Sequence, residues 1–151
     1  GFLKPDPEIT LTIPSATDKA ISVGAYDTST DKVATFSGRG FTRENNQIKP
    51  DIVAPGVNIR SAATGGGTTV LSGTSVSGMA RVSGTSYATP FVTGSAALMM
   101  EWGIVRGNDP YLYGEKIKAY LIRGAKHLPG YEQWPNKQAG WGALCLRDSL
   151  V

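Results

Sequence analysis

A serine in the turn that opens a long apolar helix is the clearest candidate for chemistry in this sequence. Ser86 follows Gly84 and Thr85, two residues suited to a tight supporting turn, and no polar face appears after it until Glu101. Pro90 favours a helix start here, because the missing N–H of a first-turn proline would have no partner anyway. The free N–H groups and the dipole of a helix N-terminus favour negative charge. We therefore predict that Ser86 is a nucleophile whose backbone N–H helps to stabilise an oxyanion, with a structural N-cap as the alternative.

A serine hydroxyl becomes a strong nucleophile when a base takes its proton and a carboxylate orients that base. The sequence contains one histidine, His127, at a helix-to-loop exit where a surface or capping role is expected. The chain order Ser86, Asp109, His127 would fit a hydrolase triad, but the G-x-S-x-G string of that fold is absent. A second Gly-Thr-Ser ends at Ser75 and leads into Val-Ser-Gly, which predicts a hairpin tip rather than a second nucleophile.

The composition is typical of one globular domain, with neither the clustered cations of a nucleic-acid-binding protein nor a membrane-spanning segment. The 151 residues are 40% hydrophobic and 18% charged, and the net charge is only +3. The cations are scattered, so we expect no nucleic-acid partner, and no apolar run reaches the ~18 residues of a membrane span. The single Cys145 excludes an internal disulfide, and its apolar surroundings predict a buried, inert thiol. No acidic cluster has the spacing of metal ligands, so no metal or cofactor is expected.

Alternating apolar residues and turn formers divide the chain into short strands and two helices. Residues 2–18 carry three prolines and predict an extended or edge segment with a short strand at 9–13. A long helix is expected over residues 86–102, and a second one opens at Asp109 and Pro110 and ends at Gly124. Further strands are expected at residues 20–26, 33–40 and 51–56, with 58–62 paired to 68–72 as an antiparallel hairpin and one more short strand near Leu144.

Four blocks of this sequence together resemble the catalytic domain of subtilisin-like serine proteases, the subtilases. Residues 84–94 match every fixed position of that family's nucleophile signature, G-T-S-x-A-x-P-x-V-x-G. Phe91 replaces a common histidine of the signature, but that position is not catalytic in the family. Residues 12–25, 35–40 and 49–56 look like characteristic strands of the same domain and occur in the family's order. The sequence of residues 12–25 and the tyrosine at position 87 resemble most the clostridial spore-germination branch of the family.

The resemblance implies an α/β fold, the C-terminal half of a subtilisin-like three-layer domain with a mostly parallel sheet, an antiparallel hairpin and a buried helix after the nucleophile. On this basis residues 1–151 are the C-terminal part of a catalytic domain. The family's order is Asp, His, Ser, so its triad Asp and His and its oxyanion Asn would precede Gly1, and His127 lies on the wrong side to be the base. Catalytic work within this chain would rest on Ser86, with Gly84 and Thr85 supporting the turn.

Two functions from different classes follow from the resemblance. The first is a serine endopeptidase that cleaves peptide or protein substrates through an acyl-enzyme on Ser86 in the full-length protein, with the fragment alone inactive. The second is a pseudoprotease whose fold serves as a regulatory or binding module. Retention of Ser86 favours the first function. The family resemblance also implies a secreted, cell-envelope or spore-associated protein.

A half-domain would expose surfaces that the other half covers. The strand at residues 20–25 would lack a neighbour, and the helix at 86–102 would lack part of its cover. Unpaired sheet edges and exposed apolar surface favour pairing with other chains. We therefore expect two protein partners besides the substrate, namely the missing N-terminal half and a second copy of the fragment.

Overall fold

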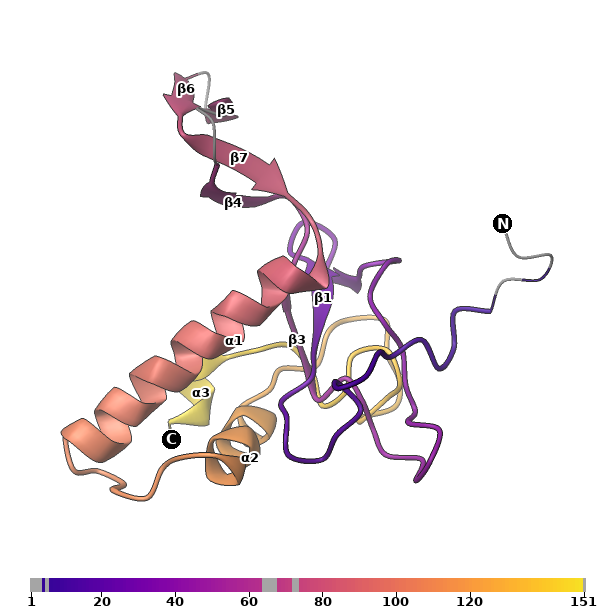
Figure 1. Ribbon diagram of the computed structural model, residues 1–151, viewed down its shortest axis with the longest axis vertical. Coiled ribbons are helices and arrows are strands. Elements are labelled where there is room, and N and C mark those ends of the chain that lie inside the picture. Colours follow the sequence, from indigo (N-terminus) through magenta and orange to yellow (C-terminus); the bar gives the residue numbers. More distant parts are fainter. Residues whose placement is uncertain (1–3, 5, 64–67, 72–73, 151) are drawn as a thin grey trace.

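A small mixed sheet forms the centre of the molecule (Figure 1). The structure, a computed structural model, describes residue 4 and residues 6–63, 68–71 and 74–150. Side chains are described for these residues except within 64–77. Strand β1 (Val23–Asp27) lies between β2 (Lys32–Val33), which is antiparallel to it, and β3 (Ile52–Pro55), which is parallel to it. Small and β-branched residues favour strands that are buried on both faces, as in a parallel sheet, and β1 and β3 form such a parallel pair.

Strand β3 is buried on both faces, and its side chains alternate between two clusters. Ile52 and Ala54 belong to the larger core, which also contains the buried side of helix α1 (Thr85–Met100). Val53, between them, belongs to a second cluster that is built mainly from the C-terminal loops. The sheet therefore separates a helical layer, which carries Ser86, from a layer of loops.

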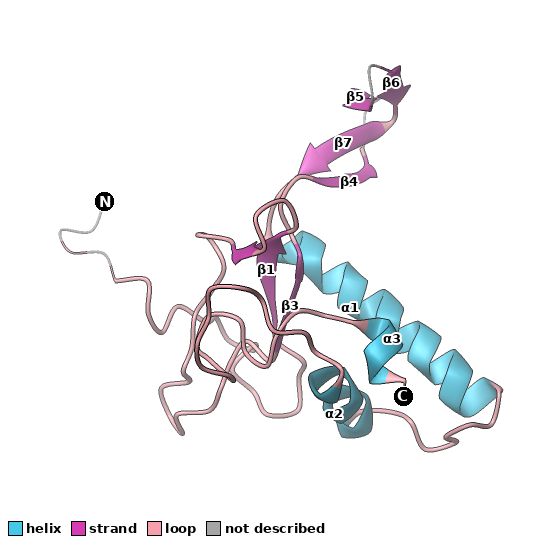
Figure 2. Ribbon diagram, turned by 180° about the vertical axis from the view of Figure 1, so that it is seen from behind, coloured by secondary structure: helices cyan, strands magenta, loops and turns pink. Residues whose placement is uncertain are grey.

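A two-part β-hairpin arm projects from the body beside the first turn of α1 (Figures 1 and 2). Strand β4 (Ile59–Ala62) pairs antiparallel with β7 (Met79–Val82), and β5 (Thr68–Leu71) pairs with β6 (Thr74–Ser77). The predicted pairing of residues 58–62 with 68–72 is therefore wrong. Each of these segments pairs with a later strand, because a short hairpin closes locally inside the longer one.

Helix α1 continues beyond Met100 as a π-helical turn, η2 (Glu101–Val105), whereas the predicted helix ended at residue 102. The side of α1 that faces the sheet is buried and consists of Ala88, Val92, Ser95 and Met99. On a side of the helix next to this buried stripe, Phe91 and Leu98 are 41% and 54% exposed. The expected burial of this helix therefore holds on one side only, because the described chain supplies cover from one side.

Helix α2 (Glu115–Arg123) ends where predicted, with Gly124 as its C-cap, but the predicted start is wrong. Residues 109 and 110 lie in the preceding loop. The Asp109 carboxylate accepts hydrogen bonds from Lys116 Nζ (2.6 Å) and Tyr120 Oη (3.1 Å) of α2 instead of capping a helix. The carboxylate of Asp109 thus makes tertiary hydrogen bonds to α2 in place of the expected hydrogen bond to a helix N-terminus.

The C-terminal segment adds to the sheet and then folds back on α2. A single parallel bridge joins Ala143 to Val53, and Leu144 N–H donates to Val53 O, in place of the predicted strand near Leu144. Helix α3 (Leu146–Ser149), which the sequence did not predict, follows and contacts α2. Gly124 leaves room for this contact, since a Cβ there would lie 2.4 Å from Ser149 N.

Two other predicted strands are absent or shorter. Residues 9–13 form an irregular segment between a bend and a turn. Thr10 N–H, which donates to Arg39 O, fixes this segment in place of a strand ladder. Of residues 33–40, only Val33 belongs to a strand. The segment after β2 nevertheless covers the edge of β1 that we expected to be unpaired, since Ala34 N–H donates to Ala25 O and Ala25 N–H donates to Ser37 Oγ.

Candidate active site

Ser86 is the second residue of α1, and the turn before it is fixed to the chain that leaves β3. Gly84 N–H donates to Gly56 O (2.8 Å), and Asn58 N–H donates to Ser83 Oγ (2.9 Å). A Cβ on Gly56 would lie 3.0 Å from Gly84 O, so the close approach depends on glycine. Gly84 itself has φ +155°, a conformation that L side chains rarely adopt. These contacts hold the start of the helix, and Ser86 with it, against the sheet.

The surroundings of Ser86 suit a nucleophile. The residue is exposed, and its side chain caps no N–H of the helix. In the first turn, Tyr87 and Ala88 N–H donate to Gly84 O, while Ser86 N–H has no acceptor among the described residues. Pro90 lies inside α1 rather than in the predicted first turn, and it offers no N–H to the Ser86 carbonyl. A free N–H and the positive end of the helix dipole therefore meet at this residue.

A cavity of about 410 Å³ opens beside Ser86. Thr85, Ser86 and Thr89 line it from α1, so the candidate nucleophile borders the space. Its volume lies in the range of ligand pockets. Sequence reasoning missed the remaining walls, because they come from segments far apart in the chain: Thr10, Leu11, Thr12, Ser15, Ile21, Ser22, Val23, Phe36, Gly38 and Pro50.

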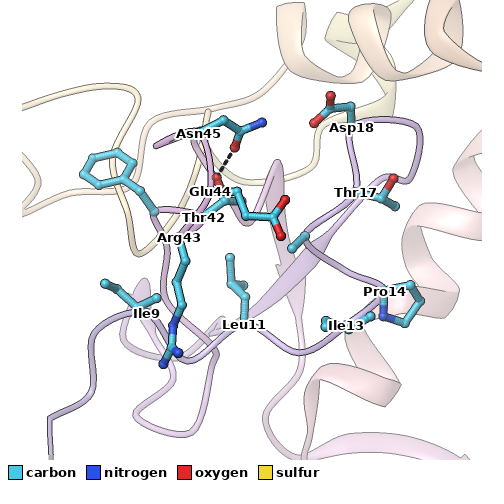
Figure 3. Close-up of a pocket in the computed structure, with 12 residues that line it drawn as sticks. Ile9, Leu11, Ile13, Pro14, Thr17, Asp18, Thr42, Arg43, Glu44 and Asn45 are labelled. Atoms are coloured by element: carbon cyan, nitrogen blue, oxygen red, sulfur yellow. Dashed lines mark hydrogen bonds between the residues drawn. The ribbon is translucent and has the colours of Figure 1, made fainter.

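A larger cavity of about 690 Å³ lies next to the first one, and Leu11 lines both. Figure 3 shows its apolar walls, among them Ile9 and Ile13, facing the polar loop at residues 42–45. Ser86 does not line this cavity. The smaller cavity, which Ser86 borders, is therefore the candidate site, although the other is more spacious.

A buried network of charges fixes one wall of the smaller cavity. One oxygen of Asp51 accepts from Lys49 Nζ (2.7 Å) and from Ser22 N–H (2.7 Å), and the other pairs with Lys118 Nζ (2.8 Å). Lys49 is 1% exposed, and burial lowers the pKa of its ammonium group below the usual range, although Asp51 opposes this shift. Ser22 and Pro50 line the cavity, so the network positions part of its wall.

The one histidine lies on the far side of the sheet from α1. The ring of His127 stacks on Trp134 with 4.4 Å between centroids and 1° between planes, and Trp134 packs against the cluster of Val53. His127 is exposed, which agrees with the expected surface role. Ser75 lies in β6 opposite Val70, so the predicted hairpin tip is corrected to a strand position, and the side chain of Ser75 is outside the described ones.

Three further expectations from the sequence concern metal ligands, membrane spans and Cys145. In the described part of the chain, no group of three or more His, Cys, Asp or Glu side chains is placed to hold a metal ion. No helix among the described residues is both long and apolar enough to cross a bilayer. Cys145 is a free thiol that is half-buried, not fully buried as predicted, and it stands at the N-cap of α3, where the neighbouring residues are half-buried too.

Known proteins match this chain along almost its whole length. The sequence model of the subtilase family matches residues 5–142. Serine protease AprX of Bacillus subtilis is 37% identical over 99% of this chain, which covers 34% of AprX. The human membrane-bound transcription factor site-1 protease is 32% identical over 91% of this chain, which covers 12% of that protein.

Solved protease structures share the fold. The CspB protease of Clostridium perfringens superposes with a TM-score of 0.83 at 46% identity, over 98% of this chain and 30% of CspB. The prenylagaramide maturation protease PagA gives a TM-score of 0.69 at 30% identity, over 96% of this chain and 46% of PagA. The chain thus spans about a third of the length of AprX and CspB. Its α/β fold is that of part of a subtilisin-like domain, and the chain belongs to the subtilase family.

Proposed function

We propose that the complete protein is a serine endopeptidase with Ser86 as its nucleophile. The observation that carries this proposal is the place of Ser86, exposed at the second residue of α1 and on the border of a cavity. Membership of the subtilase family supports it, since AprX and CspB are described as proteases. In this proposal Gly84 and Thr85 support the turn, and the substrate is a peptide or a protein.

The chemical steps follow from this geometry. A base takes the proton of Ser86 Oγ while that oxygen attacks the carbonyl carbon of the scissile peptide bond. Ser86 N–H and the N-terminal end of α1 stabilise the negative charge that develops on the carbonyl oxygen. Transfer of the proton to the leaving amine breaks the peptide bond and leaves an ester on Ser86. Water then hydrolyses the ester to a carboxylic acid and the free serine.

The base and the carboxylate that orients it are, in this proposal, supplied by the part of the domain that the resemblance places upstream. The relatives AprX and CspB are about three times as long as this chain. Within the chain, His127 stacks on Trp134 behind the sheet and is not positioned to serve Ser86. Residues 1–151 then form the C-terminal part of the catalytic domain and have no appreciable activity by themselves.

A fluorophosphonate probe tests the proposal, because it reacts with serines that a base has activated. We expect the complete protein to be labelled at Ser86, as mapped by mass spectrometry. The 151-residue chain should react more slowly by several orders of magnitude, since loss of a triad member costs up to about 10⁶ in kcat. Ser75→Ala is the matched control, because Ser75 ends the other Gly-Thr-Ser of the chain, and it should leave labelling unchanged.

Rapid labelling of Ser86 in the 151-residue chain would contradict the proposed division of catalytic residues. A complete protein that folds and retains Ser86 but fails to react would instead support the alternative, a pseudoprotease that acts as a regulatory or binding module. The upstream coding sequence separates the two as well, since the endopeptidase requires an Asp block, D-[ST]-G, and a His block, H-G-T-x-V.

The open side of α1 is the surface that the rest of the domain covers in this proposal. Phe91 and Leu98 are exposed there. Gly94 lies between them along the helix, and apart from its chain neighbours and the nearby backbone of α1, no described atom lies within 4 Å of the position of a Cβ. A glycine in an exposed helix interior costs about 1 kcal/mol relative to alanine. The glycine is explained if another segment packs closely against the helix at this point.

Without that cover, we expect the 151-residue chain to self-associate through the same side of α1. Sedimentation equilibrium at micromolar concentration should show dimers or larger species, because exposed apolar patches favour association. Leu98→Glu should shift the equilibrium toward monomer by placing a charge in the contact, whereas Ala119→Glu, at an exposed position of α2, should not. A monomeric wild-type chain with a cooperative unfolding transition would show that this part of the domain is self-sufficient.

A further inference from the structure

Two arginines carry all the charge in the arm and in α1, and the fold places them side by side. Residues 52–100 contain Arg60 and Arg81 and no other Arg, Lys, His, Asp or Glu. In the antiparallel pair of β4 and β7, Arg60 stands directly opposite Arg81. Residues opposite each other in such a ladder share one face of the strand pair, with Cβ atoms about 4.5–5.5 Å apart. The arm therefore presents two guanidinium groups on one face.

The described chain does not neutralise this pair. Arg60 and Arg81 are both exposed, and neither forms an ion pair with a carboxylate of the described residues. Arg81 Nη1 donates to Asn58 O (3.1 Å), a neutral acceptor. By contrast, the exposed Arg106 pairs with Glu101 at 2.8 Å. Because like charges directly opposite destabilise a strand pair, the two arginines fit an anionic ligand better than a structural role.

The pair lies close to the candidate nucleophile. β7 runs through the fixed turn at Ser83 and Gly84 into α1, so Arg81 precedes Ser86 by five residues. Five extended residues span at most about 18 Å. Figures 1 and 2 show the arm rising beside the first turn of α1. A peptide bound in extended form across Ser86 would cover the same distance with a similar number of residues.

We propose that Arg60 and Arg81 recognise an acidic side chain, Asp or Glu, in the peptide substrate within about five residues of the scissile bond. Guanidinium groups bind carboxylates through pairs of parallel N–H···O bonds, which gives both affinity and orientation. This inference rests on the proposed endopeptidase function and adds a substrate class to it. Nucleic acid fits less well, because phosphate backbones are bound by clustered cations and this arm has only two.

A series of peptides cleaved by the complete protein tests the proposal. Each peptide carries one Glu, moved through the five positions on either side of the scissile bond, with Gln in its matched partner and an amidated C-terminus. At one position or more, Glu should raise kcat/KM about tenfold over Gln, and added salt should reduce this gain. Changing both Arg60→Gln and Arg81→Gln should bring the ratio of the Glu to the Gln peptide close to 1.

Charge reversal separates recognition from a structural role. With both Arg60→Glu and Arg81→Glu, a Lys peptide should become the better substrate at the same position. Arg106→Gln, at the far end of α1 from Ser86, is the matched control and should keep the Glu preference. An active protein without a Glu preference, or with one that survives the double Gln change, would overturn the recognition site and leave the endopeptidase function intact.

A binding measurement gives a readout that does not depend on turnover. Fluorescence anisotropy of the labelled Glu and Gln peptides, with Ser86→Ala in the complete protein, should give a Kd about tenfold lower for the Glu peptide. The double Gln change should abolish the difference. Equal affinities before and after that change would refute the recognition site even if the protein proves to have no peptidase activity.

Discussion

Replacing Ser86 by alanine in the complete protein is expected to lower kcat for peptide hydrolysis by about 10⁶-fold. Alanine is compatible with the second residue of α1 and keeps the cavity, but it lacks the oxygen that forms the ester. KM should change little, since the lost interaction belongs mainly to the transition state. Initial rates over a range of peptide concentrations measure both quantities.

The fold should survive this substitution, because Ser86 is exposed and its side chain caps no helix N–H. An unchanged thermal midpoint would separate a loss of chemistry from a loss of structure. Thr89→Ala, on the same wall of the cavity, is the matched control and should reduce kcat by less than about tenfold, since its hydroxyl already bonds to Thr85 O. Activity of Ser86→Ala within tenfold of wild type would identify a different nucleophile.

Asp51→Asn is expected to lower the free energy of unfolding by about 3–5 kcal/mol. The carboxylate of Asp51 is the shared partner of the Lys49 and Lys118 ammonium groups, and it also accepts from Ser22 N–H. The asparagine keeps one acceptor oxygen but no charge, so the Lys49 ammonium group, 1% exposed, loses the carboxylate that neutralises it and keeps only neutral acceptors such as Ala20 O. The effect is a large share of the 5–15 kcal/mol that stabilises a typical domain. Denaturant unfolding of the protein measures it.

A half-buried carboxylate at the surface, with two cationic partners, provides the control. Asp148 contacts Lys126 at 3.3 Å and Arg147 at 3.1 Å, and both cations are largely in solvent. Asp148→Asn should therefore cost no more than about 1 kcal/mol. Equal effects of the Asp51 and Asp148 substitutions would show that burial of the Lys49 network adds nothing to stability.

The position of Ser86 could be predicted because its signals are local. A Gly-Thr-Ser turn followed by a long apolar segment predicts a helix start wherever it occurs, and the structure begins α1 at Thr85. The end of the second helix could also be predicted from a local signal, since Gly124 is a favoured helix C-cap and the structure ends α2 there. The strands at β1 and β3 also carry their signal in their own composition, a run of small and β-branched residues.

The errors arise where tertiary contacts override local patterns. Asp109 looked like an N-cap, but Lys116 and Tyr120 use its carboxylate in the fold. Alternation in residues 58–62 and 68–72 predicted strands correctly but not their partners, since β4 and β5 carry similar patterns and each pairs with a later strand. The exposure of Phe91 and Leu98 depends on which other segments cover α1, and no local pattern reports that.

The buried charge network around Asp51 and the arginine pair of the arm are hard to predict from the sequence. Lys49 and Asp51 flank a proline directly before an apolar strand, but no local pattern predicts that they are buried or that Lys118 is their third member. Arg60 and Arg81 are twenty-one positions apart, and only the register of β4 and β7 makes them neighbours. A scan for the absence of acids over residues 52–100 would have drawn attention to both arginines.

The bridge between Val53 and Ala143 determines when, during translation, strand β3 can complete its pairing. A ribosome completes β3 well before it reaches residue 143, so one edge of β3 lacks its partner for roughly 5–20 s at 5–20 residues per second. During that time the apolar strand can pair with another nascent chain. Co-translational folding of this segment therefore ends with the docking of residues 142–144, and binding of a chaperone to residues 52–55 until then would limit aggregation.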